Sequence, residues 1–203
     1  MDAVWARLAS DIARGLPRDA FLLNQHVSVV AALSDFGLSG DDIAKPAMDA
    51  HAAAMSAFVE SALDVHARSW TTWVRKIEGA LAATLAPAKF ATPQALLAAL
   101  PASTLPPVDA VEAESVVRDL SAGWKAALAA LHEEARRYLA PADEQDGRNT
   151  LAALKALFSR FAEYHQRGAA LLARAYPTAP PAWARDLVPL QAVYLEMRRF
   201  GSK

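Results

Sequence analysis

The sequence predicts an all-α protein, an elongated antiparallel helical bundle with three long amphipathic helices plus shorter N- and C-terminal helices. Alanine-rich segments at residues 45–86, 107–139 and 147–175 place apolar residues at steps of three and four, which is the period of a helix. Prolines separate these segments, and no stretch shows the apolar–polar alternation of a β-strand. We expect a single helical domain over 1–203, with these parts: N-terminal short helices at 1–38, the long-helix bundle at 39–175 with a Pro-rich connection at 87–107, and a C-terminal helix at 182–200.

Two short helices are expected ahead of the bundle. The first carries Trp5, Leu8 and Ile12 on one side. The second, over residues 19–36, is apolar around most of its girth, and such a helix is either buried on several sides or bound to another molecule. We therefore take four residues of this segment as a candidate interaction surface: Phe21, Leu22, Val27 and Val30.

The first long segment is predicted to be one continuous helix about 60 Å long. Pro46 suits its first turn, and Pro87 ends it. Trp70 and Trp73 stand three residues apart on its apolar stripe, where they either form core or stack on a ligand or partner. Both are included in the candidate interaction surface. The opposite, water-facing side is expected to carry Glu60, Asp64, Arg68, Arg75 and Glu78.

The second and third long segments repeat this pattern. Asp109 is placed to begin the second helix and Pro141 to end it. In the third, Gly168 lies on the apolar side and removes a side chain from the packing face, so a close approach of another helix is expected there. In the final helix, Pro189 either introduces a kink or marks the true beginning.

Composition excludes several classes of function. The chain has no cysteine, a formal net charge of -1 and no basic face of the kind that binds nucleic acid. Neither a transmembrane span nor a leader segment is evident, so a cytoplasmic protein is expected. No phosphate loop, nucleophile elbow or metal-ligand spacing occurs, and we expect no catalytic, cofactor or metal residues.

Three histidines are the remaining candidates for a ligand site. His51 and His66 lie on or beside the stripe of the first long segment, about 22 Å apart along a helix, and cannot share one small site. His165 lies on the stripe of the third. His51 and His66 are each expected to bond a polar partner at a seam between helices, with a ligand or pH-sensing role as the alternative.

Residues 70–100 show one resemblance. The segment begins with Trp70, continues through an alanine-rich helix and ends with Thr92, Pro93, Gln94, Ala95, Leu96 and Leu97. It resembles the phasin family of bacterial polyhydroxyalkanoate granule proteins. The resemblance implies a non-enzymatic protein that coats a hydrophobic polymer surface with amphipathic helices and often forms oligomers.

The expected function is therefore a non-catalytic helical interaction or scaffold protein, with a hydrophobic granule surface or another protein as its partner, and with homo-oligomers left open. One alternative is a dedicated subunit or chaperone of a larger assembly. A second is a helical-bundle enzyme or ligand carrier with an internal pocket near His51, His66 or His165.

Overall fold

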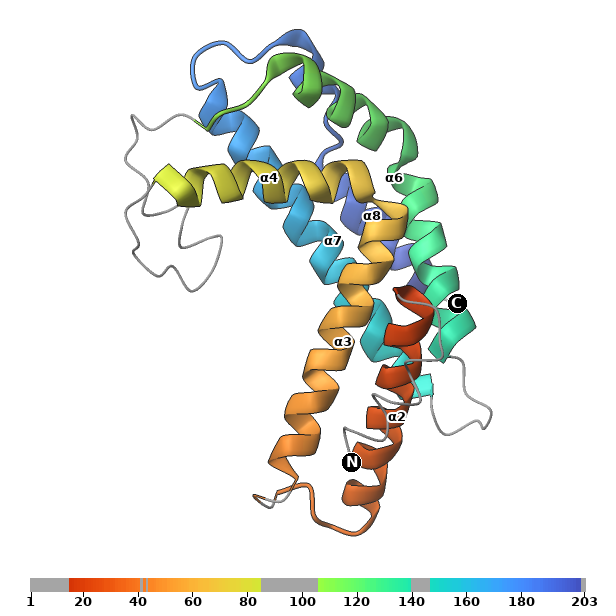
Figure 1. The fold of residues 1–203 in the computed structure, drawn as a ribbon. Coiled ribbons are helices and arrows are strands. Elements are labelled where there is room, and N and C mark those ends of the chain that lie inside the picture. Colours follow the sequence, from red (N-terminus) through yellow and green to blue (C-terminus); the bar gives the residue numbers. More distant parts are fainter. Residues whose placement is uncertain (1–14, 41, 43, 85–105, 140–146, 202–203) are drawn as a thin grey trace. The chain divides into compact units, whose positions relative to one another are not determined.

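The computed structural model describes residues 15–40, 42, 44–84, 106–139 and 147–201. All regular elements in these ranges are helices, which confirms the predicted all-α class, and no strand occurs among them. None of these helices combines the length and apolarity needed to cross a membrane. The elements are α2 (Leu16–Asp35), α3 (Lys45–His66), α4 (Arg68–Thr84), α6 (Ala110–Leu139), α7 (Gly147–Ala175), the short 3-10 helix η2 (Ala182–Asp186) and α8 (Leu190–Gly201) (Figure 1).

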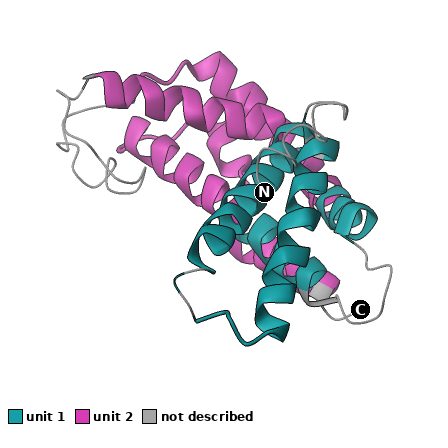
Figure 2. Ribbon diagram, turned by 60° about the horizontal axis from the view of Figure 1, so that its bottom comes forward, with its two compact units in different colours: residues 1–66, 129–159 teal, residues 67–128, 160–203 magenta. Residues whose placement is uncertain are grey.

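The contacts of the chain divide it into two compact units (Figure 2). Unit 1 comprises residues 1–66 and 129–159, and unit 2 comprises residues 67–128 and 160–203. α6 and α7 each contribute one part to either unit, and each unit has its own buried apolar side chains.

Unit 1 is built around α2 and α3, which run antiparallel and pack side by side (Figure 1). We call this pair, with its connecting turn, the α2–α3 hairpin. Thr150 in the first turns of α7 holds the end of α6, because its hydroxyl donates to the Leu139 carbonyl oxygen at 2.6 Å. The core of the unit contains Ala20, Leu23, Phe58, Ala62, Leu63, Leu131, Ala135, Ala153 and Leu157.

Unit 2 contains α4, α8 and the remaining parts of α6 and α7. Asp109 begins α6 as predicted, since its Oδ1 accepts a hydrogen bond from the Glu112 backbone N–H at 2.8 Å, as a helix N-cap does. The core of the unit contains Trp70, Trp73, Ile77, Leu81, Val117, Leu120, Trp124, Phe161, Leu171 and Val193.

The prediction of one continuous helix over residues 45–86 was wrong. The segment is interrupted at Ala67, where α3 ends and α4 begins. No glycine or proline marks this position, and the apolar spacing continues across it in phase. The two halves pack in different units, so tertiary packing overrides a sequence that would also suit an uninterrupted helix.

The C-terminal helix also differs from the prediction of one helix over 182–200. Residues 182–186 form the 3-10 helix η2, and α8 starts only at Leu190. Pro189 marks this true beginning, because its carbonyl oxygen accepts from the N–H groups of Ala192 and Val193. The predicted helix around Trp5 and most of the Pro-rich connection, including the Thr92–Leu97 part of the phasin resemblance, lie outside the described residues.

Candidate interaction surface

Polar contacts within unit 1 fix the orientation of α2. The Ser61 hydroxyl on α3 donates to the Asp19 carboxylate on α2. Near the middle of α2, Asn24 Nδ2 donates to the carbonyl oxygen of Tyr138 on α6 at 2.8 Å. These contacts leave Ala20 and Leu23 as the two fully buried apolar residues among the described side chains of α2.

The predicted surface residues of α2 are only half buried. This holds for Phe21, Leu22, Val27 and Val30, and equally for Val29 and Leu33. An apolar residue that keeps part of its surface in water gives up part of the roughly 25 cal/mol per Å² that burial supplies. α2 therefore retains apolar surface that a further contact would stabilise.

Phe36 directly follows the last residue of α2 and is 80% exposed. The backbone there forms a Schellman motif: Gly37 N–H donates to the Ser34 carbonyl at 2.9 Å, and Leu38 N–H donates to the Leu33 carbonyl at 2.8 Å. The motif requires a left-handed residue, which Gly37 provides at φ 72°. The backbone that carries Phe36 is thus held in a defined geometry.

The same end of the hairpin is acidic. Asp35, Asp42 and Asp49 are exposed, and Met48, on the first turn of α3, is an exposed apolar neighbour in the sequence. We call Asp35, Phe36, Asp42, Met48 and Asp49 the hairpin tip.

Trp70 and Trp73 are not part of this surface. Each is 2% exposed in the core of unit 2, so the alternative that they form core is correct and their inclusion in an exposed surface was wrong. Their rings stack with centroids 5.4 Å apart. The predicted close approach at Gly168 is confirmed, because a Cβ built there would lie 2.1 Å from Cζ2 of Trp70.

His165 lies beside the two tryptophans. Its ring centroid is 6.2 Å from that of Trp70, and the residue is 2% exposed. Among the described residues, neither of its ring nitrogens has a hydrogen-bond partner, and the buried indole nitrogens of Trp70 and Trp73 have none either. Burial lowers the pKa of His165, and the nearby backbone of Val188 offsets this only in part, without a hydrogen bond of good geometry.

A buried ion pair in unit 2 was missed by sequence reasoning. Both carboxylate oxygens of Glu78 accept from Arg167, with Nε to Oε1 at 2.7 Å, and Glu78 is 7% exposed instead of facing water as predicted. Burial alone would lower the pKa of Arg167, but the hydrogen bonds and charge of Glu78 outweigh it and raise that pKa. Tyr164 contacts two arginines beside this ion pair. Its hydroxyl accepts a hydrogen bond from Arg75 Nε at 2.7 Å, and the centre of its ring lies 4.6 Å from the Arg167 guanidinium carbon.

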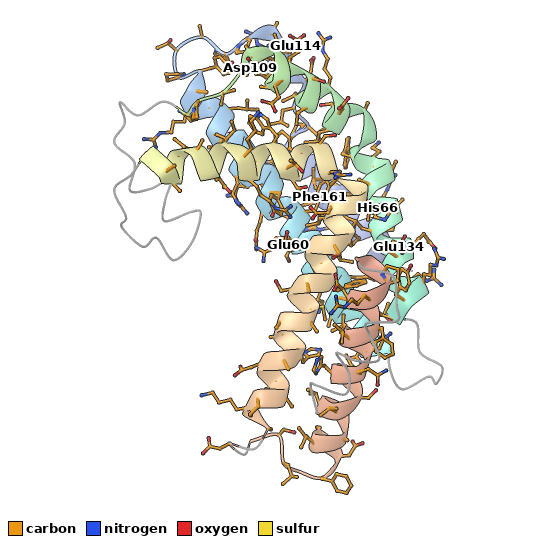
Figure 3. The ribbon with its side chains drawn as sticks, viewed as in Figure 1. Glu60, His66, Asp109, Glu114, Glu134 and Phe161 are labelled. Carbon is orange, nitrogen blue, oxygen red and sulfur yellow. The ribbon has the colours of Figure 1, made fainter. Side chains whose placement is uncertain are left out.

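The other two histidines lie apart from each other on α3. His66 Nε2 is 3.5 Å from Glu134 Oε1, a polar contact longer than a hydrogen bond of good geometry (Figure 3). Burial lowers the pKa of His51, and repulsion from His26 lowers it further.

Within the described ranges, no three His, Asp or Glu side chains gather in a way that could hold a metal ion. Comparison of the chain with protein families, with curated proteins and with solved structures gave no match.

Proposed function

We propose that the protein is a non-catalytic helical interaction protein that binds its partner through the α2–α3 hairpin. The observation that carries this proposal is the exposure of α2, whose described apolar side chains, apart from Ala20 and Leu23, all keep part of their surface in water. Exposed apolar surface that continues over several turns is typical of a binding site. Phe36, directly after the last residue of the helix, is also an exposed apolar side chain.

Two kinds of partner follow from this proposal. The resemblance to phasins favours a hydrophobic polymer surface, met in the cytoplasm and coated by the apolar side of α2. A protein partner would instead make the chain a dedicated subunit or chaperone, and half-buried side chains such as Val27 and Val30 would then complete a core shared with the partner.

A double substitution in α2 tests the proposal. Val27→Asp with Val30→Asp places two charges on the surface, whereas Val111→Asp introduces the same chemistry at a valine that is 79% exposed on α6. The tagged full-length chain is incubated at low salt with native lysate and, separately, with polyhydroxyalkanoate particles. Retained material is identified by mass spectrometry, and helix content is followed by far-UV circular dichroism.

We expect the wild type and the Val111 variant to retain the same partner, and the double variant to lose it with unchanged helix content. Retention on the particles would identify a granule coat, and a single stoichiometric protein would identify a subunit or chaperone. A wholesale loss of helical signal in the double variant would show that this side of α2 is ordinary core. Equal retention by all three proteins would also contradict the proposal.

A second candidate function, a ligand carrier, is favoured by the unpartnered nitrogens of His165, Trp70 and Trp73. Each unpaired buried group costs about 1–3 kcal/mol, so a small molecule whose acceptor oxygens paired the two indole N–H groups and the imidazole N–H would bind favourably. Tryptophan fluorescence of the full chain tests this function by titration with benzoate, with Trp183→Phe as the control outside the cluster. A saturable change that survives in this control would support the carrier, and an unchanged spectrum would exclude benzoate-like ligands.

A further inference from the structure

The α2–α3 hairpin differs in charge from the rest of the chain. Residues 15–66 contain seven acidic residues and two basic ones, a formal net charge of -5, whereas the whole chain carries -1. Residues 67–203 contain thirteen acidic and seventeen basic residues, a formal net charge of +4. Among the described helices, the two most apolar, α2 and α3, thus belong to the acidic part of the sequence.

At the hairpin tip this charge has no partner among the residues that the structure describes. Asp35, Asp42 and Asp49 are exposed, and none of them forms an ion pair or hydrogen bond with a described residue. Phe36 at 80% and Met48 at 49% exposure lie next to Asp35 and Asp49 in the sequence. The tip therefore combines two exposed apolar side chains with three negative charges that have no partner among the described residues.

We propose that the hairpin tip binds a cationic amphipathic helix of a partner protein. Such a helix offers apolar side chains at i, i+3 and i+4, which would contact Phe36 and Met48, and lysine or arginine on its flanks, which would pair with the three aspartates. Opposite potentials also steer the two molecules together. Nucleic acids and anionic lipid headgroups carry the same sign of charge as the tip and are repelled by it.

The backbone geometry supports Phe36 as the anchor of this contact. Gly37 and the two Schellman hydrogen bonds hold the end of α2 in place before any partner arrives. A side chain on a fixed backbone loses less conformational entropy on binding, and aromatic residues are frequent binding hot spots.

This inference rests on the proposed interaction function and names the chemistry of the partner. Its probe is a fluorescein-labelled Leu/Lys peptide of about 18 residues with an apolar stripe at helical spacing, compared with a Leu/Glu peptide of the same pattern. Binding to the full-length protein is measured by fluorescence anisotropy between about 0.05 and 0.5 M salt.

Charge removal at the tip is the decisive variant. Asp35→Asn, Asp42→Asn and Asp49→Asn together should weaken Leu/Lys peptide binding on the order of tenfold and flatten its salt dependence. A matched triple variant removes the same number of charges elsewhere on the exposed surface and should bind like the wild type: Asp119→Asn, Glu133→Gln and Asp186→Asn. Phe36→Ser should abolish binding while the far-UV spectrum stays unchanged.

The outcomes separate this inference from the proposed function. Equal binding of both peptides, or an unaffected Asn variant of the tip, overturns the inference, and the function stands if the Val27 and Val30 double variant still loses its partner. Concentration-dependent self-association that the tip variants abolish also overturns it, because the occupant would then be a second copy of the chain. Loss of the lysate-captured partner in the tip variant, together with selective binding of the Leu/Lys peptide, supports it.

Discussion

Replacing Gly168 by alanine should destabilise the protein, although the same change usually stabilises a helix. The added Cβ would lie 2.1 Å, 2.6 Å and 2.9 Å from Cζ2, Cη2 and Cε2 of Trp70. Carbon atoms in favourable contact are about 3.5–4.0 Å apart, so the indole ring would have to retreat by more than about 1 Å.

The ring has little room for such a movement. Trp70 is 2% exposed, stacks on Trp73 and lies against His165. Overpacking a close-packed core costs about 1–3 kcal/mol, and a contact this short belongs at the upper end of that range. The helix propensity of alanine returns up to about 1 kcal/mol, which leaves a net loss of about 2 kcal/mol.

Chemical denaturation followed by far-UV circular dichroism measures this loss, and the melting temperature should fall by roughly 4–8 °C for a protein of this size. Gly79→Ala is the matched control in the same unit, because Gly79 is an exposed position inside α4 with no atom within 4 Å of the added Cβ. That variant should gain up to about 1 kcal/mol. A Gly168→Ala protein as stable as the wild type would refute the packing described for Trp70.

Three further predictions concern stability. Burial lowers the pKa of His165 below its usual 6.5, so near that pH the unfolded chain binds a proton that the folded chain does not. The stability that is present above pH 6.5 is therefore lost as the pH falls. His165→Gln should make the free energy of unfolding, measured by denaturation, depend less steeply on pH. Glu78→Gln leaves the buried Arg167 charge without its carboxylate and should lower the free energy of unfolding by about 3–5 kcal/mol in the same assay. The joint replacement of Glu78 by leucine and Arg167 by methionine should lower it much less. Equal losses in the two variants would show that the pair is not coupled. Gly37→Ala forces a Cβ into a left-handed conformation and should cost about 1–2 kcal/mol, and an unchanged midpoint would contradict the Schellman geometry.

Helix positions were predictable where the signals are local. The bounds of α7 agree with the predicted segment 147–175, and Asp109 and Pro46 lie at the starts of α6 and α3 as expected. Capping side chains, prolines and apolar spacing act within a few residues, so the sequence alone displays them. The break at Ala67 has no such local signal, since it reflects how the two halves pack in separate units.

The candidate surface was predictable only in part. The half-buried state of Phe21 and Val30 follows from an apolar helix with too few neighbours to cover it. The burial of Glu78 does not follow from its own segment, where a charged residue opposite the apolar stripe is normally exposed. Its partner Arg167 lies 89 positions away in the sequence, and only the packing of α4 on α7 brings the two together.

Hydrogen exchange of the full-length chain, with and without its captured partner or polymer particle, tests the central claim most directly. Backbone amides of α2 (Leu16–Asp35) and of the turn that follows it should exchange more slowly in the bound state, because the partner would cover the apolar side of this helix and reduce its local opening. The exchange rates of the backbone amides in unit 2 should show no comparable change. Protection confined to unit 2, with α2 exchanging at the same rate in both states, would contradict binding through the α2–α3 hairpin.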